Sequence, residues 1–237
     1  MAIKSTAIVR LNPAAKVTKR TVGTEEQPVL VIDDVLLDAD DMVDFAAEAT
    51  FEVPQTTYYP GLNANLPLAY LRTLLPVLRP TFARAFGIPL DLPLHAYGFY
   101  ALATHGLDQL EPLQRVPHYD QVDPMCLAMV HYLCRAQGGG TGFFRHDASG
   151  HESITMSRRN GYTKQVATEL NDLGERLDGF AGPDTPNYTL IDQVDIKFNR
   201  LVLYRSHVLH CALFDKARLS PDPRTGRLTA NSFFRPQ

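Results

Sequence analysis

Residues 200–214 read RLVLYRSHVLHCALF. Two apolar, partly β-branched runs, 200–204 and 210–214, flank a polar break at Arg205 and Ser206. Such runs with a break between them predict two β-strands joined by a short connection. His210 opens the second strand, and a histidine at the start of a buried strand is a better candidate for a metal ligand than one on a polar loop. The alternative for His210, taken alone, is a core histidine with satisfied hydrogen bonds.

A second histidine lies upstream in the motif His118-Tyr119-Asp120. Side chains alternate between the faces of an extended strand, so residues two apart can approach one ion from a single strand end. A third ligand at a right angle must come from a distant strand, and His210 suits this task. Two imidazoles and one carboxylate form the facial triad that holds non-haem Fe(II) and leaves coordination positions open. His207 competes with His210, but it follows the break so closely that we expect it to lie too early.

The last apolar run, residues 227–234, has an alternating pattern. Period two places three polar side chains, Arg227, Thr229 and Asn231, on one face. A polar face on a strand this late in the chain indicates a lined cavity. The planar fork of arginine matches a carboxylate with two hydrogen bonds, and a hydroxyl two residues further on can add a third. The alternative is an edge strand with Arg227 in solvent.

The order of these motifs is more specific than any one of them, because a lone His-x-Asp arises readily by chance in a chain with eight histidines and 26 acidic residues. The ordered set resembles the Fe(II)/2-oxoglutarate-dependent dioxygenases, and among them the prolyl-4-hydroxylase-like branch, over roughly residues 95–237. The matching segments are PHYD at 117–120, MVHYLC at 129–134, GGGTGFF at 138–144, LVLYRS at 201–206 and GRLT at 226–229.

The resemblance implies a fold, two cofactors and residue roles. The fold is a double-stranded β-helix, or jelly roll, of about eight strands, and the cofactors are Fe(II) and 2-oxoglutarate. The implied iron ligands are His118, Asp120 and His210. Arg227 would anchor a carboxylate of 2-oxoglutarate, with Thr229 and Tyr132 as hydrogen-bonding partners. A core position with a satisfied hydroxyl is the alternative for Tyr132.

The implied reaction is hydroxylation or desaturation of a C–H bond in a small-molecule, amino-acid or peptide substrate, with dioxygen as oxidant. A carboxylate ligand at position 120 fills the site that halogenating relatives leave free for chloride. Two connections, 145–188 and 210–227, are longer than the resemblance leads us to expect. Because of the second, Arg218 competes with Arg227 as the anchor, although the strand context of Arg227 fits better.

The chain as a whole is expected to be mainly β with flanking helices and to form one domain over residues 1–237. Residues 1–93 would supply an N-terminal strand and supporting helices, and residues 94–237 the catalytic core. The pattern predicts a first strand at 29–36 and eight core strands. The core strands are expected at 96–102, 116–119, 126–134, 143–145, 190–198, 200–204, 210–214 and 228–234.

Three helices are expected at 38–49, 66–86 and 160–177. The second would break near Pro76 or Pro80, because proline removes a helical hydrogen bond. The third belongs to an insertion at about 146–188. This insertion could be a substrate lid, the contact surface of a homodimer or a plain excursion of the chain.

The composition suits a globular enzyme, with 45% hydrophobic residues for a substantial core. The net charge of −3 gives no reason to expect a nucleic-acid partner or an anionic membrane. No apolar run reaches about 18 residues, so no membrane span is predicted. Cys126, Cys134 and Cys211 lack metal-type spacing and are expected to be reduced, buried thiols of a cytoplasmic protein.

Two other classes of function remain open on the sequence. A cupin-like metal-binding jelly roll without oxygenase activity would use the same ligands but would not need Arg227. A metal-dependent hydrolase or isomerase could bind Zn(II) or Mn(II) at the same triad. A hydrolase has no need of a buried arginine and threonine facing the metal, so that pair favours the oxygenase.

Overall fold

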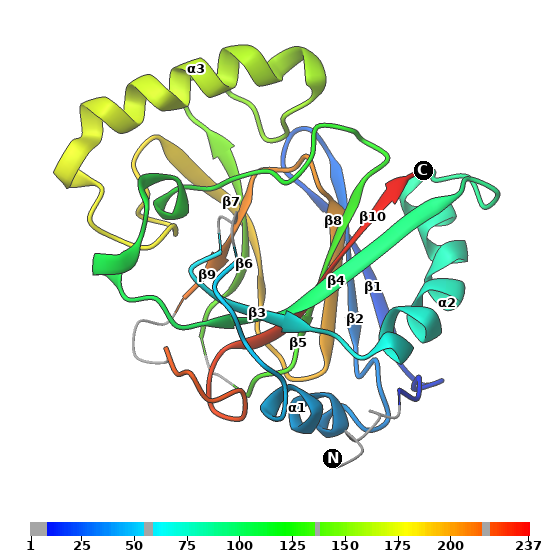
Figure 1. The fold of residues 1–237 in the computed structure, drawn as a ribbon. Helices are drawn as coiled ribbons and strands as arrows, with labels where there is room; N and C mark the ends of the chain where they lie inside the picture. The colour runs from blue at the N-terminus through cyan, green and yellow to red at the C-terminus, as the bar shows by residue number, and fades with distance from the viewer. Residues whose placement is uncertain (1–8, 55–58, 136–137, 215–218) are drawn as a thin grey trace.

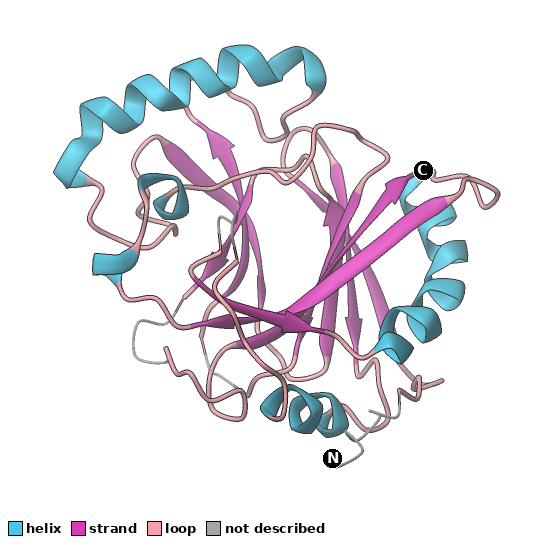
Figure 2. Cartoon of the chain, in the orientation of Figure 1, coloured by secondary structure: helices cyan, strands magenta, loops and turns pink. Residues whose placement is uncertain are grey.

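The computed structural model describes residues 9–54, 59–135, 138–214 and 219–237 (Figure 1). Within them, ten strands form two antiparallel sheets (Figure 2). The larger sheet has the order β1-β2-β8-β5-β10-β4-β3, and the smaller has the order β7-β6-β9. The bounds of the strands are β1 (Lys16–Val22), β2 (Gln27–Asp33), β3 (Gly61–Asn65), β4 (Leu94–Ala103), β5 (Leu127–Tyr132), β6 (Gly140–His146), β7 (Tyr188–Asp195), β8 (Arg200–Arg205), β9 (His210–Leu213) and β10 (Leu228–Pro236).

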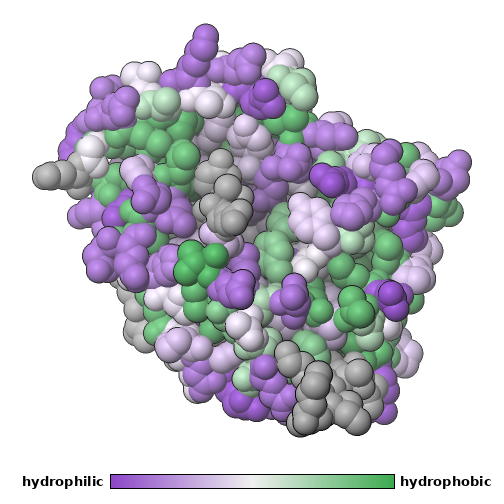
Figure 3. Space-filling view, in the orientation of Figure 1, coloured by the Kyte–Doolittle hydropathy of each residue, from purple (hydrophilic) through white to green (hydrophobic). Residues whose placement is uncertain are grey.

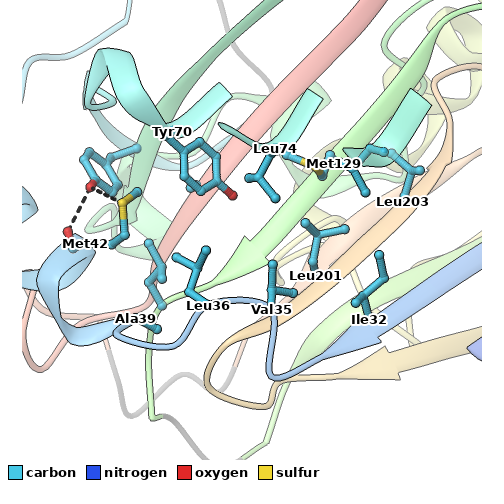
Figure 4. Packing of buried hydrophobic residues seen from close by; sticks show 14 of the residues in the cluster. Ile32, Val35, Leu36, Ala39, Met42, Tyr70, Leu74, Met129, Leu201 and Leu203 are labelled. Carbon is cyan, nitrogen blue, oxygen red and sulfur yellow. Dashed lines mark hydrogen bonds between the residues drawn. The ribbon is translucent and has the colours of Figure 1, made fainter. Parts of the chain in front are cut away.

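The two faces of the larger sheet have different surroundings, because side chains alternate between the faces along each strand. On β8, Leu201 and Leu203 point to the outer face and join the main core cluster with helix α2 (Leu68–Phe86). Figure 4 shows these two leucines beside Met129 of β5 and Leu74 of α2. Val202 and Tyr204 point the other way, toward the smaller sheet, and pack in a separate cluster. The outer face is therefore a closed hydrophobic core, and the inner face is free to line a site.

Helix α2 runs unbroken through both prolines, so the expected break near Pro76 or Pro80 is wrong. The helix is held by buried side chains four residues apart, such as Leu74, Leu78 and Phe82. Both prolines lie on the exposed side of the helix. The carbonyl groups that lose a partner there can bind water, and the packed face keeps the helix continuous. Helix α1 (Asp40–Ala47) falls within its expected range and buries Met42 and Ala46.

The insertion carries helix α3 (Met156–Leu173), which begins four residues before the expected start and continues as a 3-10 turn at Gly174–Arg176. Its buried residues Tyr162 and Val166 pack with side chains of the smaller sheet, including Phe144. Figure 1 shows α3 outside the smaller sheet, and its outward side is largely hydrophilic in Figure 3. The helix is thus the outer cover of that sheet.

The described residues form ten strands where nine were expected, one N-terminal and eight in the core, and the differences have local reasons. The cationic stretch at β1 pairs with β2 along its whole length although most of its side chains are exposed. The short β3 has little apolar character but pairs with β4. In contrast, the expected strand at 116–119 is reduced to an isolated bridge between His118 and His210. Backbone pairing, which needs no apolar pattern, explains the two additions.

Two other expectations concern the cysteines and membrane spans. Cys126, Cys134 and Cys211 are all buried thiols, as expected. Over the described ranges, no helix is long and apolar enough to cross a membrane.

A buried polar network ties α2 to the larger sheet. His131 on β5 lies between the hydroxyl of Tyr70 (2.9 Å from Nδ1) and Oδ1 of Asn199 (3.1 Å from Nε2). Asn199 Oδ1 also accepts from the amide of Leu36, so Nε2 of His131 donates and Nδ1 accepts the Tyr70 hydroxyl proton. This pattern requires the neutral imidazole.

Replacing Phe82 by alanine should test how far α2 anchors the fold. Phe82 is fully buried and meets Phe234 of β10 edge-on, with ring centroids 4.9 Å apart. We expect Phe82→Ala to lower the free energy of unfolding by about 3–5 kcal/mol in urea titrations. Val77 on the same helix is 58% exposed, and Val77→Ala should change the free energy of unfolding by less than about 0.5 kcal/mol. Equal effects would contradict this account of the core.

The protein should become less stable as the pH is lowered, because His131 is buried in its neutral form. Burial lowers the pKa of His131 to about 4, whereas an unfolded histidine titrates near pH ~6.5. Below pH ~6.5 the unfolded chain takes up a proton that the folded protein refuses, so stability is lost as the pH falls toward about 4. His131→Gln should remove on the order of 3 kcal/mol of this pH dependence. Parallel curves of unfolding free energy against pH for the two proteins would refute the prediction.

Candidate metal centre and cavity

The structure brings His118, Asp120 and His210 together at one point. Their potential ligand atoms all lie within 4.8 Å of one another. Asp120 Oδ1 is 3.9 Å from Nε2 of His118, and Asp120 Oδ2 is 3.6 Å from Nε2 of His210. Two imidazole nitrogens and a carboxylate converging in this way are the donor set that suits a divalent transition metal with open positions.

Backbone pairing positions the three side chains. The amide of His118 donates to the carbonyl of His210 (2.9 Å), and the amide of His210 donates to the carbonyl of His118 (2.8 Å). The amide of Asp120 donates to the carbonyl of Ser206 (2.8 Å), in the turn between β8 and β9. The segment 118–120 therefore runs beside β9 as a short extension of the smaller sheet.

The tautomer of His210 is also fixed by the backbone. Its Nδ1 lies 2.9 Å from the carbonyl oxygen of Val208. A carbonyl can only accept, so Nδ1 carries the proton and Nε2 presents a lone pair toward Asp120 and His118. A hydrogen bond of this kind orients a metal-binding imidazole.

Burial sets the charges of the group. It holds the pKa of His118 well below its usual range, and the neighbouring His210 acts in the same direction. It also raises the pKa of Asp120. Asp120 Oδ2 is buried and has no hydrogen-bond partner in the described part of the chain. The imidazole of His118, whose neutral form is favoured by burial, and a carboxylate oxygen without a donor fit a cation, which would supply the missing positive charge.

The group opens into a cavity of about 670 Å³ between the two sheets. The larger sheet contributes side chains from β4, β5, β8 and β10, and the smaller sheet contributes β6 and β9. No residue of α3 lines the cavity, so the helix itself does not cover it as a lid. The part of the insertion that reaches the cavity is Ala181, which follows the helix.

Arg227 lies in this cavity and is only 5% exposed, so the alternative of an edge arginine in solvent is wrong. Its Nη1 donates to the hydroxyl of Tyr59 (3.1 Å), and its Nη2 donates to the carbonyl of Gly140 (3.0 Å). Its Nε is buried without a partner, and no carboxylate in the described residues pairs with it. A buried guanidinium without a counter-charge is a strong site for an anion. Arg218 lies outside the described residues.

The two other predicted cofactor residues lie behind the cavity wall. Thr229 is fully buried, and its hydroxyl donates to the carbonyl of Ala101 (3.4 Å). Tyr132 is also fully buried and shares a hydrogen bond of 2.6 Å with Thr141. Neither Thr229 nor Tyr132 lines the cavity, but Thr141 does. Their contact with a co-substrate would therefore run through their neighbours.

Tyr59 and Thr141 are among the cavity residues that sequence reasoning did not assign to the site. Burial raises the pKa of Tyr59, while Arg227 and a hydrogen bond with Thr229 act against the rise. Tyr59 thus links the last strand to the segment before β3, a contact with no signal in the sequence. Thr141 stands inside the glycine-rich motif at 138–144 and could have been found there. His207 lies outside the metal group, with Nε2 3.4 Å from Gln27 Oε1.

Comparison with known proteins places the chain in a family. The sequence model of a family of unknown function, DUF6445, matches residues 13–234, and the chain belongs to that family. No curated protein matches the sequence.

Solved structures provide more distant likenesses. HygX from Streptomyces hygroscopicus, with nickel and 2-oxoglutarate bound, is 16% identical with a TM-score of 0.48, over 90% of this chain and 84% of HygX. An N-substituted L-amino acid dioxygenase from Burkholderia ambifaria AMMD, in complex with alpha-KG, is 11% identical with a TM-score of 0.43, over 95% of each chain. HygX has also been solved with iron.

The ligand assignment predicts which histidine is needed for metal binding. Co(II) added to the protein should give a visible ligand-field spectrum, and His118→Ala, Asp120→Ala and His210→Ala should each abolish it or weaken Co(II) binding at least about tenfold. His207→Ala is the matched control, because His207 lies three residues from His210 but outside the group. A spectrum that survives in His210→Ala and disappears in His207→Ala would reverse the assignment.

Proposed function

We propose that this protein is an Fe(II)- and 2-oxoglutarate-dependent dioxygenase that hydroxylates, or desaturates, a C–H bond of a small molecule, amino acid or peptide. One observation carries the proposal. A convergent His-Asp-His group and a buried arginine that has no carboxylate partner among the described residues share one cavity. In this proposal the two facing sheets form the double-stranded β-helix of a single catalytic domain.

His118, Asp120 and His210 would hold Fe(II). The guanidinium of Arg227 would bind the distal carboxylate of 2-oxoglutarate with two parallel hydrogen bonds, using donors that now include the unpartnered Nε. The hydroxyls of Tyr59 and Thr141, which line the same cavity, are placed to complete that carboxylate's hydrogen bonds. Tyr132 would orient Thr141 through their shared hydrogen bond.

The charges of the assembled site support this occupancy. A buried Arg227 and a divalent ion, set against Asp120 alone, leave an excess of positive charge in a medium of low polarity. Such an excess is unfavourable unless a counter-ion enters. The two carboxylates of 2-oxoglutarate would balance it. A monocarboxylate or a neutral ligand would not.

When bound, Fe(II) and 2-oxoglutarate supply the oxidation: dioxygen is reduced, 2-oxoglutarate becomes succinate and carbon dioxide, and a substrate C–H bond is oxidised. The chain itself positions the reactants and keeps water out. Phe143, Phe214 and Tyr204 provide the apolar surroundings, and the rings of Tyr204 and His210 lie edge-on at 4.7 Å. Apolar surroundings of this kind would exclude water from the reacting groups and limit unproductive side reactions.

Arg227→Leu separates the oxygenase from a hydrolase or a cupin-like binder. We expect metal affinity to stay within about threefold of the parent protein, while the KM for 2-oxoglutarate in a succinate-release assay rises at least about thirtyfold, since a buried charge pair is lost. Arg224→Leu is the control, because Arg224 is exposed and pairs with Asp44. If 2-oxoglutarate affinity is the same in Arg227→Leu and the parent protein, the assignment of Arg227 is wrong.

A further inference from the structure

One side of the cavity is built from three aromatic rings on adjacent strands. Tyr97 and Phe99 stand on β4, and Phe233 stands on β10, where it pairs with Tyr97 in the antiparallel register. The rings of Tyr97 and Phe233 are nearly parallel, with centroids 5.3 Å apart and planes at 24°. The ring of Phe99 lies 6.0 Å from that of Phe233. All three line the cavity, and we refer to them as the aromatic wall.

The aromatic wall lies at the opposite end of the cavity from the anion site. Arg227 directly precedes β10 and Phe233 stands six residues further along on the same side of the chain, which corresponds to roughly 20 Å of extended chain. The wall nevertheless lines the same cavity as the metal group, His118, Asp120 and His210. A molecule resting on the wall would therefore share the cavity with the metal ligands, away from the space that the carboxylate bound by Arg227 would fill.

The charges around the cavity define what can rest there. Among the described residues that line it, the only formally charged side chains are Asp120 and Arg227, and both are used by the metal and the co-substrate in the proposed function. Arg235 lies over the ring of Tyr97 at the outer edge of the wall, 5.9 Å from its centroid, so a cationic group there would meet a like charge. A neutral ligand has no such penalty.

A single polar group stands in the middle of this surface. Asn231 pairs with Phe99 across the β4–β10 ladder and lines the cavity. Its Oδ1 is buried and has no hydrogen-bond partner within the described residues. A buried acceptor without a donor is unfavourable unless a ligand supplies one. Asn231 thus selects for a ligand that carries an N–H or O–H.

We infer that the substrate bears a neutral, planar ring that stacks on the aromatic wall and donates a hydrogen bond to Asn231. This inference rests on the proposed function for its role, because it treats the wall as the substrate side of the oxygenase cavity. The binding of the ring does not itself require the metal. The rings of Phe233 and Tyr97 favour a planar ligand, and Asn231 determines which edge of that ligand carries the hydrogen-bond donor.

Indole is a suitable probe, because the chain contains no tryptophan and fluorescence excited at long wavelength comes from the ligand alone. Benzofuran has the same shape without the N–H donor. Indole should bind saturably to the anaerobic protein with Fe(II) and 2-oxoglutarate and also to the protein without them, with a blue-shifted emission. Benzofuran, measured by displacement of indole, should bind about three- to tenfold more weakly.

Two variants and a control assign the contacts. Phe233→Leu should weaken both indole and benzofuran about three- to tenfold. Asn231→Leu, which keeps the size of the side chain, should weaken indole to the affinity of benzofuran and leave benzofuran unchanged. Phe198→Leu is the matched control, because Phe198 is a half-buried ring that stacks with Arg135 outside the cavity. It should change neither affinity.

Failure of this inference and failure of the proposed function are distinguishable. Absence of saturable indole binding, or affinities that Phe233→Leu leaves unchanged, would overturn the aromatic subsite even if Fe(II) and 2-oxoglutarate bind. Equal affinities for indole and benzofuran would overturn the role of Asn231. Indole binding that depends on both residues, in a protein that binds no metal, would support the subsite and refute the oxygenase.

Discussion

The two backbone hydrogen bonds between His118 and His210 are the constraint on which the site depends. They join segments that are far apart in the chain and hold their side chains on one side of the smaller sheet. The bond from the Asp120 amide to Ser206 then fixes the third ligand relative to the same turn. The ligand geometry is thus a property of the sheet.

The two faces of the larger sheet have different roles. Its outer face forms a closed core with α1 and α2, and its inner face faces the smaller sheet across the cavity. Three residues that line that cavity, Asp120, Arg227 and Asn231, each carry a buried polar atom without a hydrogen-bond partner in the described part of the chain. A buried polar atom without a partner is unfavourable. In the two proposals, a cation, an anion and a hydrogen-bond donor would satisfy these three atoms.

The sequence predicts this arrangement where chemistry and periodicity coincide. The strands at β4, β5, β8, β9 and β10 have apolar patterns; His210 opens β9, and Arg227 directly precedes β10 and faces the cavity. The apolar pattern did not predict β1 or β3, because each has a single buried apolar side chain, Val22 or Ala64, and is held mainly by backbone pairing. It also overstated the effect of Pro76 and Pro80, since packing on the far side of α2 outweighs the lost hydrogen bonds. Tyr59 could not be predicted, because only the tertiary fold brings it to Arg227.

The central claim is that one cavity binds a metal and a 2-oxo dicarboxylate together. The most direct test is an anaerobic titration of the purified protein with Fe(II) and then 2-oxoglutarate, followed by visible absorption. A weak charge-transfer band should appear only after both additions, and it should be absent from His118→Ala. Metal binding without the band would contradict the account and favour a cupin-like binder or a hydrolase. If no metal binds, the convergence of His118, Asp120 and His210 has another cause.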